Sequence, residues 1–169
     1  MTAAAEPGLE RLNTLPREQA VAELLSCCGS RAWAEAVADA RPFADRAALH
    51  ETSDAVWSAL GSDDWLEAFR AHPRIGERAA AEHRGAAWSE QEQSRVLNAG
   101  DEARAELAAL NGLYERRFGH IFLICATGMD AAEIRDAIQQ RMHNDPAAEL
   151  RIAAEEQRKI IRLRLERLL

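Results

Sequence analysis

The chain has 169 residues and a mass of 18.7 kDa, a size that fits one domain or two very small ones. Its 21 Lys and Arg against 28 Asp and Glu give a net charge of −7, which argues against a protein that binds nucleic acid or anionic membranes. Hydrophobic residues make up 47% of the chain, which excludes global disorder. Because alanine is abundant and aromatic residues are only 5%, we expect one compact, all-α multi-helix domain over residues 1–169.

The cysteines Cys27, Cys28 and Cys125 fit neither a disulfide framework nor a zinc site, because their number is odd and no Cys-x-x-Cys pair occurs. We therefore expect reduced thiols and a cytoplasmic location. The acidic N-terminus is unlike a secretory signal, and the C-terminus is unlike the usual peroxisomal address. No stretch is long enough for us to expect a membrane span.

The first half of the chain is predicted to form a loose lead-in over residues 1–13 and then four helices. Ser30 and Ser62 are expected N-caps, since a serine hydroxyl accepts a hydrogen bond from the free N–H groups of a first helical turn. Helices are expected to stop before Pro42 and Pro73, because proline cannot continue the hydrogen-bond ladder. The expected helices cover residues 16–29, 31–40, 45–60 and 63–72.

The next segment, residues 73–88, shows no clean hydrophobic period. We predict a long ordered loop there, a feature that is often functional in compact domains. Ser89 is expected to begin a long helical stretch that runs to about Arg117. Gly100 and the pair 111–112 are the points where that stretch can be interrupted.

Residues 120–128 are the only segment that could form a strand. Since no second strand is available to pair with it, the all-α class is the economical prediction. Asp130 and Glu133 have the spacing of a capping box, which predicts a helix from there to about Asn144. A final helix is expected from Asp145-Pro146 to the C-terminus.

Three polar residues lie on or beside apolar helix faces, and the first is His72. Trp65, Phe69 and His72 are spaced i, i+4 and i+7, so they share one helical face. A helix C-terminus favours the protonated imidazole, and Pro73 restricts the backbone next to it. His72 is therefore either a rigidly held acid–base group or a helix-end histidine that bonds a carbonyl.

The second is Glu92, in the segment Ser89-Glu90-Gln91-Glu92-Gln93. Ser89 and Glu92 have capping-box spacing. Glu92 also begins an apolar stripe, so its carboxylate is expected to point partly inward and to be ionised near N–H groups that can hold an anionic ligand. Capping alone and ligand binding both stay open. The stripe continues through Val96, Ala99, Ala103, Leu107, Leu110 and Tyr114.

The third is Arg164, which lies inside the apolar arc of the last helix, one turn after Ile160. An arginine that faces a core needs an anionic partner. That partner is either Glu92, in a structural salt bridge, or the anion of a substrate. The arc consists of Leu150, Ala153, Ala154, Ile160, Ile161, Leu165 and Leu168.

The other candidate functional residues have weaker support. Arg74 and Arg84 could bind anions from the predicted loop, Cys125 is expected to be a buried small hydrophobe, and residues 116–117 are expected to face solvent. No nucleophile-elbow, Walker or dinucleotide-binding glycine pattern occurs. The remaining histidines lack metal-ligand spacing; they are His50, His83, His120 and His143.

Four ordered blocks stand out: HPRIGE (72–77), WSEQEQ (88–93), YERRFGHIFLICATG (114–128) and EL…EE…KI…LRL (149–165). Two shorter blocks precede them, CCGSRAW (27–33) and ARPF (40–43). Together they resemble the 2-oxo-4-hydroxy-4-carboxy-5-ureidoimidazoline (OHCU) decarboxylase family over nearly the whole chain. The motif HPxIG alone is weakly specific, but four blocks in the right order are quite specific.

The resemblance implies an all-helical, cofactor-free decarboxylase without a metal, usually a homodimer, that converts OHCU into (S)-allantoin in urate breakdown. It implies that His72 is the proton donor and that Glu92 and Arg164 are catalytic. The residues implied to contact substrate are Pro73, Ser89, Glu90, Gln91 and Gln93 and, through the backbone, Phe122, Leu123, Ile124, Cys125 and Ala126.

A mechanism follows as a hypothesis. The ring imine of the substrate can absorb the electron pair that CO₂ leaves behind, so no cofactor is required as an electron sink. Arg164 and the N–H groups of 122–126 would hold ring oxygens or the anion. Glu92 and Gln93 would orient the N–H groups of the substrate, with ionised Glu92 raising the pKa of His72. His72 would handle the substrate hydroxyl or supply the proton.

The sequence departs from the family pattern in two ways. The SEQEQ segment contains two Glu-Gln pairs, and spacing from Ser89 favours Glu92-Gln93 as the active pair. Ser94-Arg95 follow it where smaller residues are common in relatives. Three competing hypotheses remain: a non-catalytic helical interaction module, a related ureide-processing enzyme, and a helical metal-dependent hydrolase.

Overall fold

The computed structural model describes residues 6–77 and 84–169, and these residues form ten helices and no strand. The predicted all-α class is therefore confirmed. The chain groups into two compact units, an N-terminal unit (Met1–Glu67 with Arg158–Leu169) and a central unit (Ala68–Gln157). The expectation of a single domain stays a prediction. Among the described helices, none is long and apolar enough to cross a membrane.

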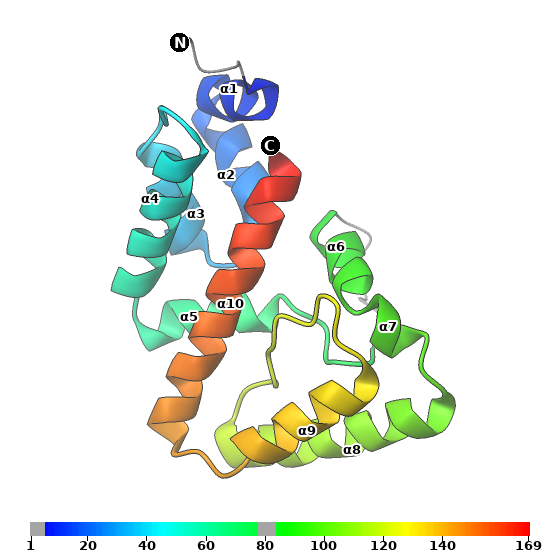
Figure 1. Ribbon diagram of the computed structural model, residues 1–169. Helices are drawn as coiled ribbons and strands as arrows, with labels where there is room; N and C mark the ends of the chain where they lie inside the picture. The colour runs from blue at the N-terminus through cyan, green and yellow to red at the C-terminus, as the bar shows by residue number, and fades with distance from the viewer. Residues whose placement is uncertain (1–5, 78–83) are drawn as a thin grey trace. The chain divides into compact units, whose positions relative to one another are not determined.

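The helices of the N-terminal unit begin where side chains can accept hydrogen bonds from free N–H groups. Ser30 Oγ accepts from the N–H of Trp33 at 3.2 Å, as predicted, and the Asp45 carboxylate accepts from the N–H of Ala48 at 2.8 Å. In this unit α2 packs on α3 and α3 on α4 (Figure 1). The elements are α1 (Pro7–Thr14), α2 (Arg17–Leu25), α3 (Arg31–Asp39), α4 (Arg46–Ala59), the start of α5 (Ser62–Arg70) and the end of α10 (Pro146–Leu168).

Three expectations for this unit are wrong. Ser62 is the first residue of α5 and not the residue before it, so it is not the N-cap. The predicted lead-in is helical over α1, where Leu9 and Leu12 are buried. Two apolar residues in one short helix are too few to show a period, so the sequence pattern missed it. The helix expected over 16–29 ends at Leu25, and the N–H groups of Cys27 and Cys28 bond back to the Leu24 carbonyl in a turn.

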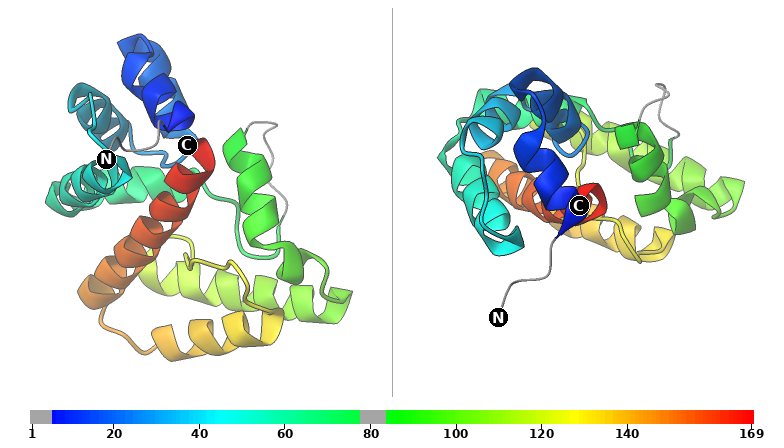
Figure 2. Two further views of the ribbon diagram at one scale, coloured as in Figure 1. Left: turned by 45° about the horizontal axis from the view of Figure 1, so that its top comes forward. Right: turned by 90° about the horizontal axis from the view of Figure 1, so that it is seen from above.

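The central unit contains two helices that lie side by side, α8 and α9, as Figures 1 and 2 both show. The capping box of α9 forms as predicted, with Asp130 and Glu133 each accepting from the backbone N–H of the other. Residues 119–130 connect α8 to α9 without regular structure. The unit's elements are the end of α5, then α6 (Arg84–Glu92), α7 (Ser94–Leu97), α8 (Asp101–Phe118), α9 (Ala131–Arg141) and the start of α10.

The expected loop over 73–88 is wrong for its last five residues, because α6 already begins at Arg84. Residues 78–83, and with them His83, lie outside the described part of the chain. The buried face of α6 consists of Gly85, Ala86, Trp88, Ser89 and Glu92. These residues have helical spacing but are mostly small or polar, so the sequence shows no hydrophobic periodicity from which the helix could be predicted.

The long helical stretch expected from Ser89 is three helices, α6, α7 and α8. The predicted break at Gly100 is confirmed, since Gly100 is the N-cap of α8, but residues 111–112 continue that helix without interruption. Residues 120–128 form no strand, as the described residues offer nothing that pairs with them.

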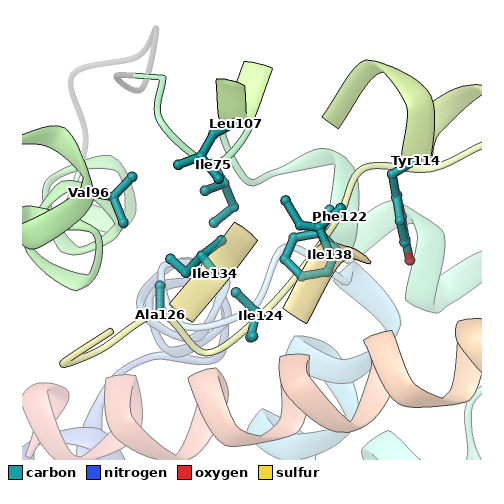
Figure 3. Close-up of a cluster of buried hydrophobic side chains, with 9 residues drawn as sticks. All are labelled: Ile75, Val96, Leu107, Tyr114, Phe122, Ile124, Ala126, Ile134 and Ile138. Carbon is teal, nitrogen blue, oxygen red and sulfur yellow. The ribbon is translucent and has the colours of Figure 1, made fainter. Parts of the chain in front are cut away.

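One hydrophobic core cluster of the central unit includes residues from, or directly after, three of the sequence blocks quoted above. Ile75 belongs to HPRIGE (72–77), and Phe122 belongs to the FLICA segment (122–126). Val96 lies three residues after the end of SEQEQ (89–93). Figure 3 shows these side chains converging with those of α8 and α9. The cluster comprises Ile75, Val96, Leu107, Tyr114, Phe122, Ile124, Ala126, Ile134 and Ile138. Burial of this cluster therefore fixes the backbone of all three blocks relative to one another.

Candidate active site

The HPRIGE segment (72–77) is irregular backbone that side chains of the central unit hold in place. Gly76 has φ of +87°, a left-handed conformation that favours glycine. The Gly76 N–H donates to Gln93 Oε1 at 3.0 Å, and its carbonyl accepts from Arg104 at 2.9 Å. Asn111 Nδ2 donates to the Ile75 carbonyl at 2.9 Å. The turn that follows His72 and Pro73 is therefore fixed by three long-range hydrogen bonds.

His72 itself lies just after α5, with its backbone N–H bonded to the Phe69 carbonyl. Its side chain is half-buried, at the boundary that the sequence predicted. The ring Nε2 is 2.8 Å from Oε1 of Gln157, a side chain of α10 that is fully buried. The ring is thus held by an amide of another helix, which a purely helix-end histidine would not require.

The segment around Glu92 differs from its prediction in one important way. Ser89 lies inside α6, where its hydroxyl donates to the Gly85 carbonyl at 3.0 Å, so it caps nothing. The expected capping box and helix N-terminus at Ser89 are therefore wrong. Glu92 is the last residue of α6, at the end whose dipole does not favour a carboxylate, and yet it is only 8% exposed.

The inward orientation expected of Glu92 is nevertheless confirmed by its burial, and Gln93 is buried beside it. Gln93 uses its side-chain carbonyl to hold the HPRIGE segment, a role the sequence did not suggest. Glu90 is half-buried and Gln91 is exposed on the other side of the helix end. The structure therefore separates the two Glu-Gln pairs, with the second pair inward.

The FLICA residues lie in the 119–130 segment, which begins at Gly119 with φ of +79°. Phe122, Leu123, Ile124 and Ala126 are buried. Cys125 is only partly buried, so its expected burial is wrong. The Cys125 N–H donates to Glu156 Oε1 at 3.3 Å, so a ligand that used this N–H would have to displace that carboxylate.

A buried ion pair lies behind the same segment. Arg141 contacts Glu149 at 2.6 Å and donates to the Leu123 carbonyl at 2.8 Å, and its guanidinium lies 4.3 Å from the ring centroid of Phe122. The Tyr114 hydroxyl also donates to Glu149, and burial together with this bond raises the pKa of Tyr114 well above its usual value. The sequence identified neither charge, because the two residues lie on different helices, α9 and α10, and no spacing within one helix connects them.

Arg164 belongs to the N-terminal unit and is 5% exposed, which confirms that it faces inward. It donates to the carbonyl of Ser26, the residue that follows α2, at 3.3 Å. Nearby Cys28 is fully buried, and burial raises the pKa of its thiol to about 12 although the positive charge of Arg164 opposes the shift. Arg164 thus helps to satisfy the open C-terminus of α2.

The candidate residues are therefore distributed over both units. His72, Pro73, the 89–93 segment and the 122–126 segment all belong to the central unit, whereas Arg164 belongs to the other. Gln157 is the site residue that sequence reasoning missed. It lies on the apolar arc of α10, three residues after Ala154 and three before Ile160, so the same spacing that identified Arg164 would have found it.

The weaker candidates are engaged elsewhere or exposed. Arg74 pairs with Glu115 at 2.6 Å, Arg84 lies over the ring of Trp88, and residues 116–117 are exposed as predicted. Within residues 6–77 and 84–169, no group of three His, Cys, Asp or Glu side chains is arranged to hold a metal ion.

Comparison with known proteins identifies the family. The profile described as OHCU decarboxylase matches residues 13–166, almost the whole chain. The chain belongs to the OHCU decarboxylase family. Among its OHCU decarboxylase relatives is one from Amia calva, 35% identical over 137 residues, which cover 79% of this chain and 77% of that protein.

A second relative is the uric acid degradation bifunctional protein TTL of Arabidopsis thaliana, 39% identical over 145 residues. The match covers 84% of this chain but only 45% of that protein, so the chain spans less than half of the bifunctional relative.

Two solved structures share the OHCU decarboxylase fold. One is an OHCU decarboxylase crystallised in the presence of (S)-allantoin, with a TM-score of 0.75 and 37% identity over 86% of this chain and 96% of that one. The other, an (S)-allantoin synthase, has a TM-score of 0.70 and 19% identity over 95% of this chain and 54% of that one, and shows likeness of fold alone.

Proposed function

We propose that the chain decarboxylates OHCU to (S)-allantoin in the breakdown of urate. The observation that carries this proposal is the likeness to the OHCU decarboxylase solved in the presence of (S)-allantoin, which this chain covers almost completely. His72, Glu92 and Arg164 support it independently. Each was identified as a polar residue at an apolar face, and each is at least half-buried in the structure.

The chemistry requires one carbon–carbon bond to break and protons to be placed on a ring nitrogen and on a ring carbon. The bond between the carboxylate and the ring carbon that bears the hydroxyl breaks, CO₂ leaves, and the electron pair forms a ring double bond to the adjacent imine carbon. The π pair of the imine moves at the same time to the ring nitrogen, which takes up a proton. The hydroxyl then loses its proton to become a carbonyl, and the carbon that bears the ureido group gains a proton. Protonation on one face of that carbon sets the (S) configuration, so the enzyme must hold the ring in one orientation.

We assign the protein groups to these steps as follows. His72 exchanges a proton with the substrate, either at the hydroxyl or at the ring carbon. Arg164 neutralises the substrate anion, while the buried Glu92 orients its N–H groups. The remaining substrate contacts are proposed for Pro73, Ser89, Glu90, Gln91 and Gln93 and for the backbone of residues 122–126. Because Ser89 lies inside α6, we expect it to contribute to substrate binding through the C-terminal end of that helix.

The configuration of the product tests the proposed reaction. OHCU generated in situ from urate decays spontaneously to racemic allantoin, so circular dichroism of the product distinguishes enzymatic from spontaneous conversion. With this protein we expect an excess of the (S) enantiomer. Racemic product at high enzyme concentration would rule the proposed reaction out.

Substitutions test the residues. His72→Ala and Glu92→Ala are expected to lower kcat well beyond tenfold, which corresponds to more than about 1.4 kcal/mol of barrier. His143→Ala is the matched control, because His143 is an exposed histidine. Full activity in both folded site variants would place the chemistry elsewhere. For Arg164→Ala we expect a similar loss, with the exposed Arg151→Ala as its control.

We further propose that the protein is a homodimer, as the family resemblance implies, and that it is cytoplasmic, as its cysteine usage suggests. Light scattering coupled to size-exclusion chromatography measures its mass directly. A mass near twice 18.7 kDa is expected, and a monomeric mass across micromolar concentrations would contradict the dimer. Fractionation of the source cells tests the compartment.

A further inference from the structure

The contact between His72 and Gln157 indicates how the His72 ring is oriented for catalysis. Gln157 is fully buried, and its Oε1 is 2.8 Å from His72 Nε2. Its other polar atom, Nε2, is buried and has no hydrogen-bond partner among residues 6–77 and 84–169. Burying an amide with half of its hydrogen-bonding capacity unused costs stability, and such groups call for a functional explanation.

The contact determines where the His72 ring carries its proton. An amide oxygen only accepts hydrogen bonds, so the ring nitrogen that faces it must be the donor. In the neutral ring this arrangement places the proton on Nε2 and leaves the lone pair on Nδ1. The same contact also stabilises the imidazolium, since Nε2 carries a proton in that form as well.

The neighbouring charged groups are engaged in contacts of their own. On α10, Glu156 accepts from the Cys125 N–H, and Glu149 pairs with Arg141. Beyond His72 in the HPRIGE segment, Arg74 pairs with Glu115 of α8. The His120 ring is tilted against the ring of Phe69, with their centroids 5.6 Å apart, and its Nδ1 lies 2.9 Å from the Ile121 carbonyl. Glu92, at the end of α6, is a further buried carboxylate of the central unit.

We propose that Gln157 is a positioning residue, whose Oε1 accepts a hydrogen bond from Nε2–H of His72 and so fixes the orientation and tautomer of that ring. Nδ1 is then the nitrogen that takes up and returns the proton during the reaction. This inference rests on the proposed function for its catalytic part, but the contact between the two side chains can be tested without substrate.

The test compares two substitutions of similar size. Gln157→Met removes the acceptor, which should lower the pKa of His72 because the imidazolium loses a hydrogen bond. Gln157→Glu replaces the amide with a carboxylate and should raise it. Gln140→Met and Gln140→Glu are the matched controls, because Gln140 is exposed on α9. NMR titration of the free protein, with the His72 signals assigned by their loss in His72→Ala, measures each pKa, and ¹⁵N shifts identify the tautomer.

Kinetics then separate positioning from structural support. Gln157→Met should lower kcat at least tenfold with little change in KM, and the pH profile of kcat/KM should move in the direction of the NMR titration. Gln157→Glu should retain more activity than Gln157→Met and shift the profile the opposite way. Circular dichroism and thermal unfolding check that each variant is folded, and if Gln157→Met does not fold, the direction of the Gln157→Glu shift decides.

An unchanged His72 titration in folded Gln157→Glu, or an Nδ1–H tautomer in the unaltered protein, would overturn the inference. So would a Gln157→Met variant with wild-type kcat. If instead the titration moves as expected while the unaltered protein yields racemic allantoin, the proposed reaction fails and the contact between Gln157 and His72 stands.

Discussion

Two irregular segments of the central unit contain most of the proposed substrate contacts, and they are held by different means. The HPRIGE segment is held by two neutral amides, those of Gln93 and Asn111, and by the half-buried guanidinium of Arg104. The 119–130 segment is held by the buried ion pair of Arg141 and Glu149. In both cases, side chains from helices make hydrogen bonds with backbone groups that have no partner within a regular helix or sheet.

This difference in support predicts that the 119–130 segment depends more on a single contact than the HPRIGE segment does. The HPRIGE segment is held by several hydrogen bonds of modest strength, so the loss of one should leave the others in place. A buried ion pair is an all-or-none arrangement, because removing one partner leaves an uncompensated charge in the core. We therefore expect mutations behind the 119–130 segment to affect stability and mutations around the HPRIGE segment to affect mainly activity.

Arg141→Ala should have the largest effect on stability. It leaves Glu149 buried without its countercharge and frees the Leu123 carbonyl, so the free energy of unfolding should fall by about 3 to 5 kcal/mol. Urea unfolding followed by circular dichroism measures this loss. Arg151→Ala is the control on an exposed surface of α10, with an expected change within about 0.5 kcal/mol. A loss below 1 kcal/mol in Arg141→Ala would contradict the comparison.

Asn111→Leu should have a smaller effect. It keeps the approximate volume but leaves the buried Ile75 carbonyl without its donor, so we expect a loss of about 1 to 3 kcal/mol. The unpartnered Oδ1 of Asn111 is removed at the same time, which offsets part of the cost. Activity should fall further than stability, since this bond orients the turn after His72. Unchanged kcat together with a large loss of stability would show that the segment does not tune catalysis.

Gly76→Ala tests the left-handed turn alone, because a Cβ there would meet no atom of the described residues within 4 Å. The strain of a left-handed alanine should cost about 1 to 2 kcal/mol. Gly112→Ala is the matched control, since Gly112 lies in α8 and its Cβ would make only an ordinary contact with Arg116. That control should gain roughly 0.5 to 1 kcal/mol. Equal melting temperatures for the two variants would contradict the assignment of strain to Gly76.

Tyr114→Phe should reveal itself mainly through pH. The pKa of Tyr114 is raised in the folded state, so its stabilising effect is complete below the usual value of 10 and is lost as pH rises further. Stability of the unaltered protein should therefore fall more steeply above pH 10 than that of Tyr114→Phe. Cys28, whose pKa is raised to about 12, adds a slope from about pH 9 in both proteins. Denaturant midpoints from pH 9 to 11.5 measure the difference, and parallel curves would contradict it.

The sequence was informative where a signal is local. Ser30, Gly100 and the pair of Asp130 and Glu133 define helix starts through contacts within one turn, and all are found as predicted. The buried placement of Glu92 and Arg164 was also predictable, because a polar residue at an apolar spacing must face inward with its neighbours.

The sequence was misleading where the deciding contact is distant. The S-x-x-E spacing at Ser89 is the same whether a helix begins there or four to five residues earlier, and packing of the small-residue face of α6 decided in favour of the earlier start. The roles of Arg141 and Gln157 depend on Leu123 and His72, which no local pattern connects to them. Such pairings become visible only when the fold brings the partners together.

The exposed contact between Arg74 and Glu115 has a consequence for ionic strength. Its arginine side chain is 51% exposed, whereas the Glu149 side chain of the buried pair is fully covered. Dissolved ions weaken the attraction between exposed charges, with a screening length of about 8 Å at physiological ionic strength, but they do not reach a desolvated pair. Concentrated salt should therefore loosen the outer support of the HPRIGE segment and leave the 119–130 segment unaffected. The salt dependence of turnover thus reports on one segment of the site and not on the other.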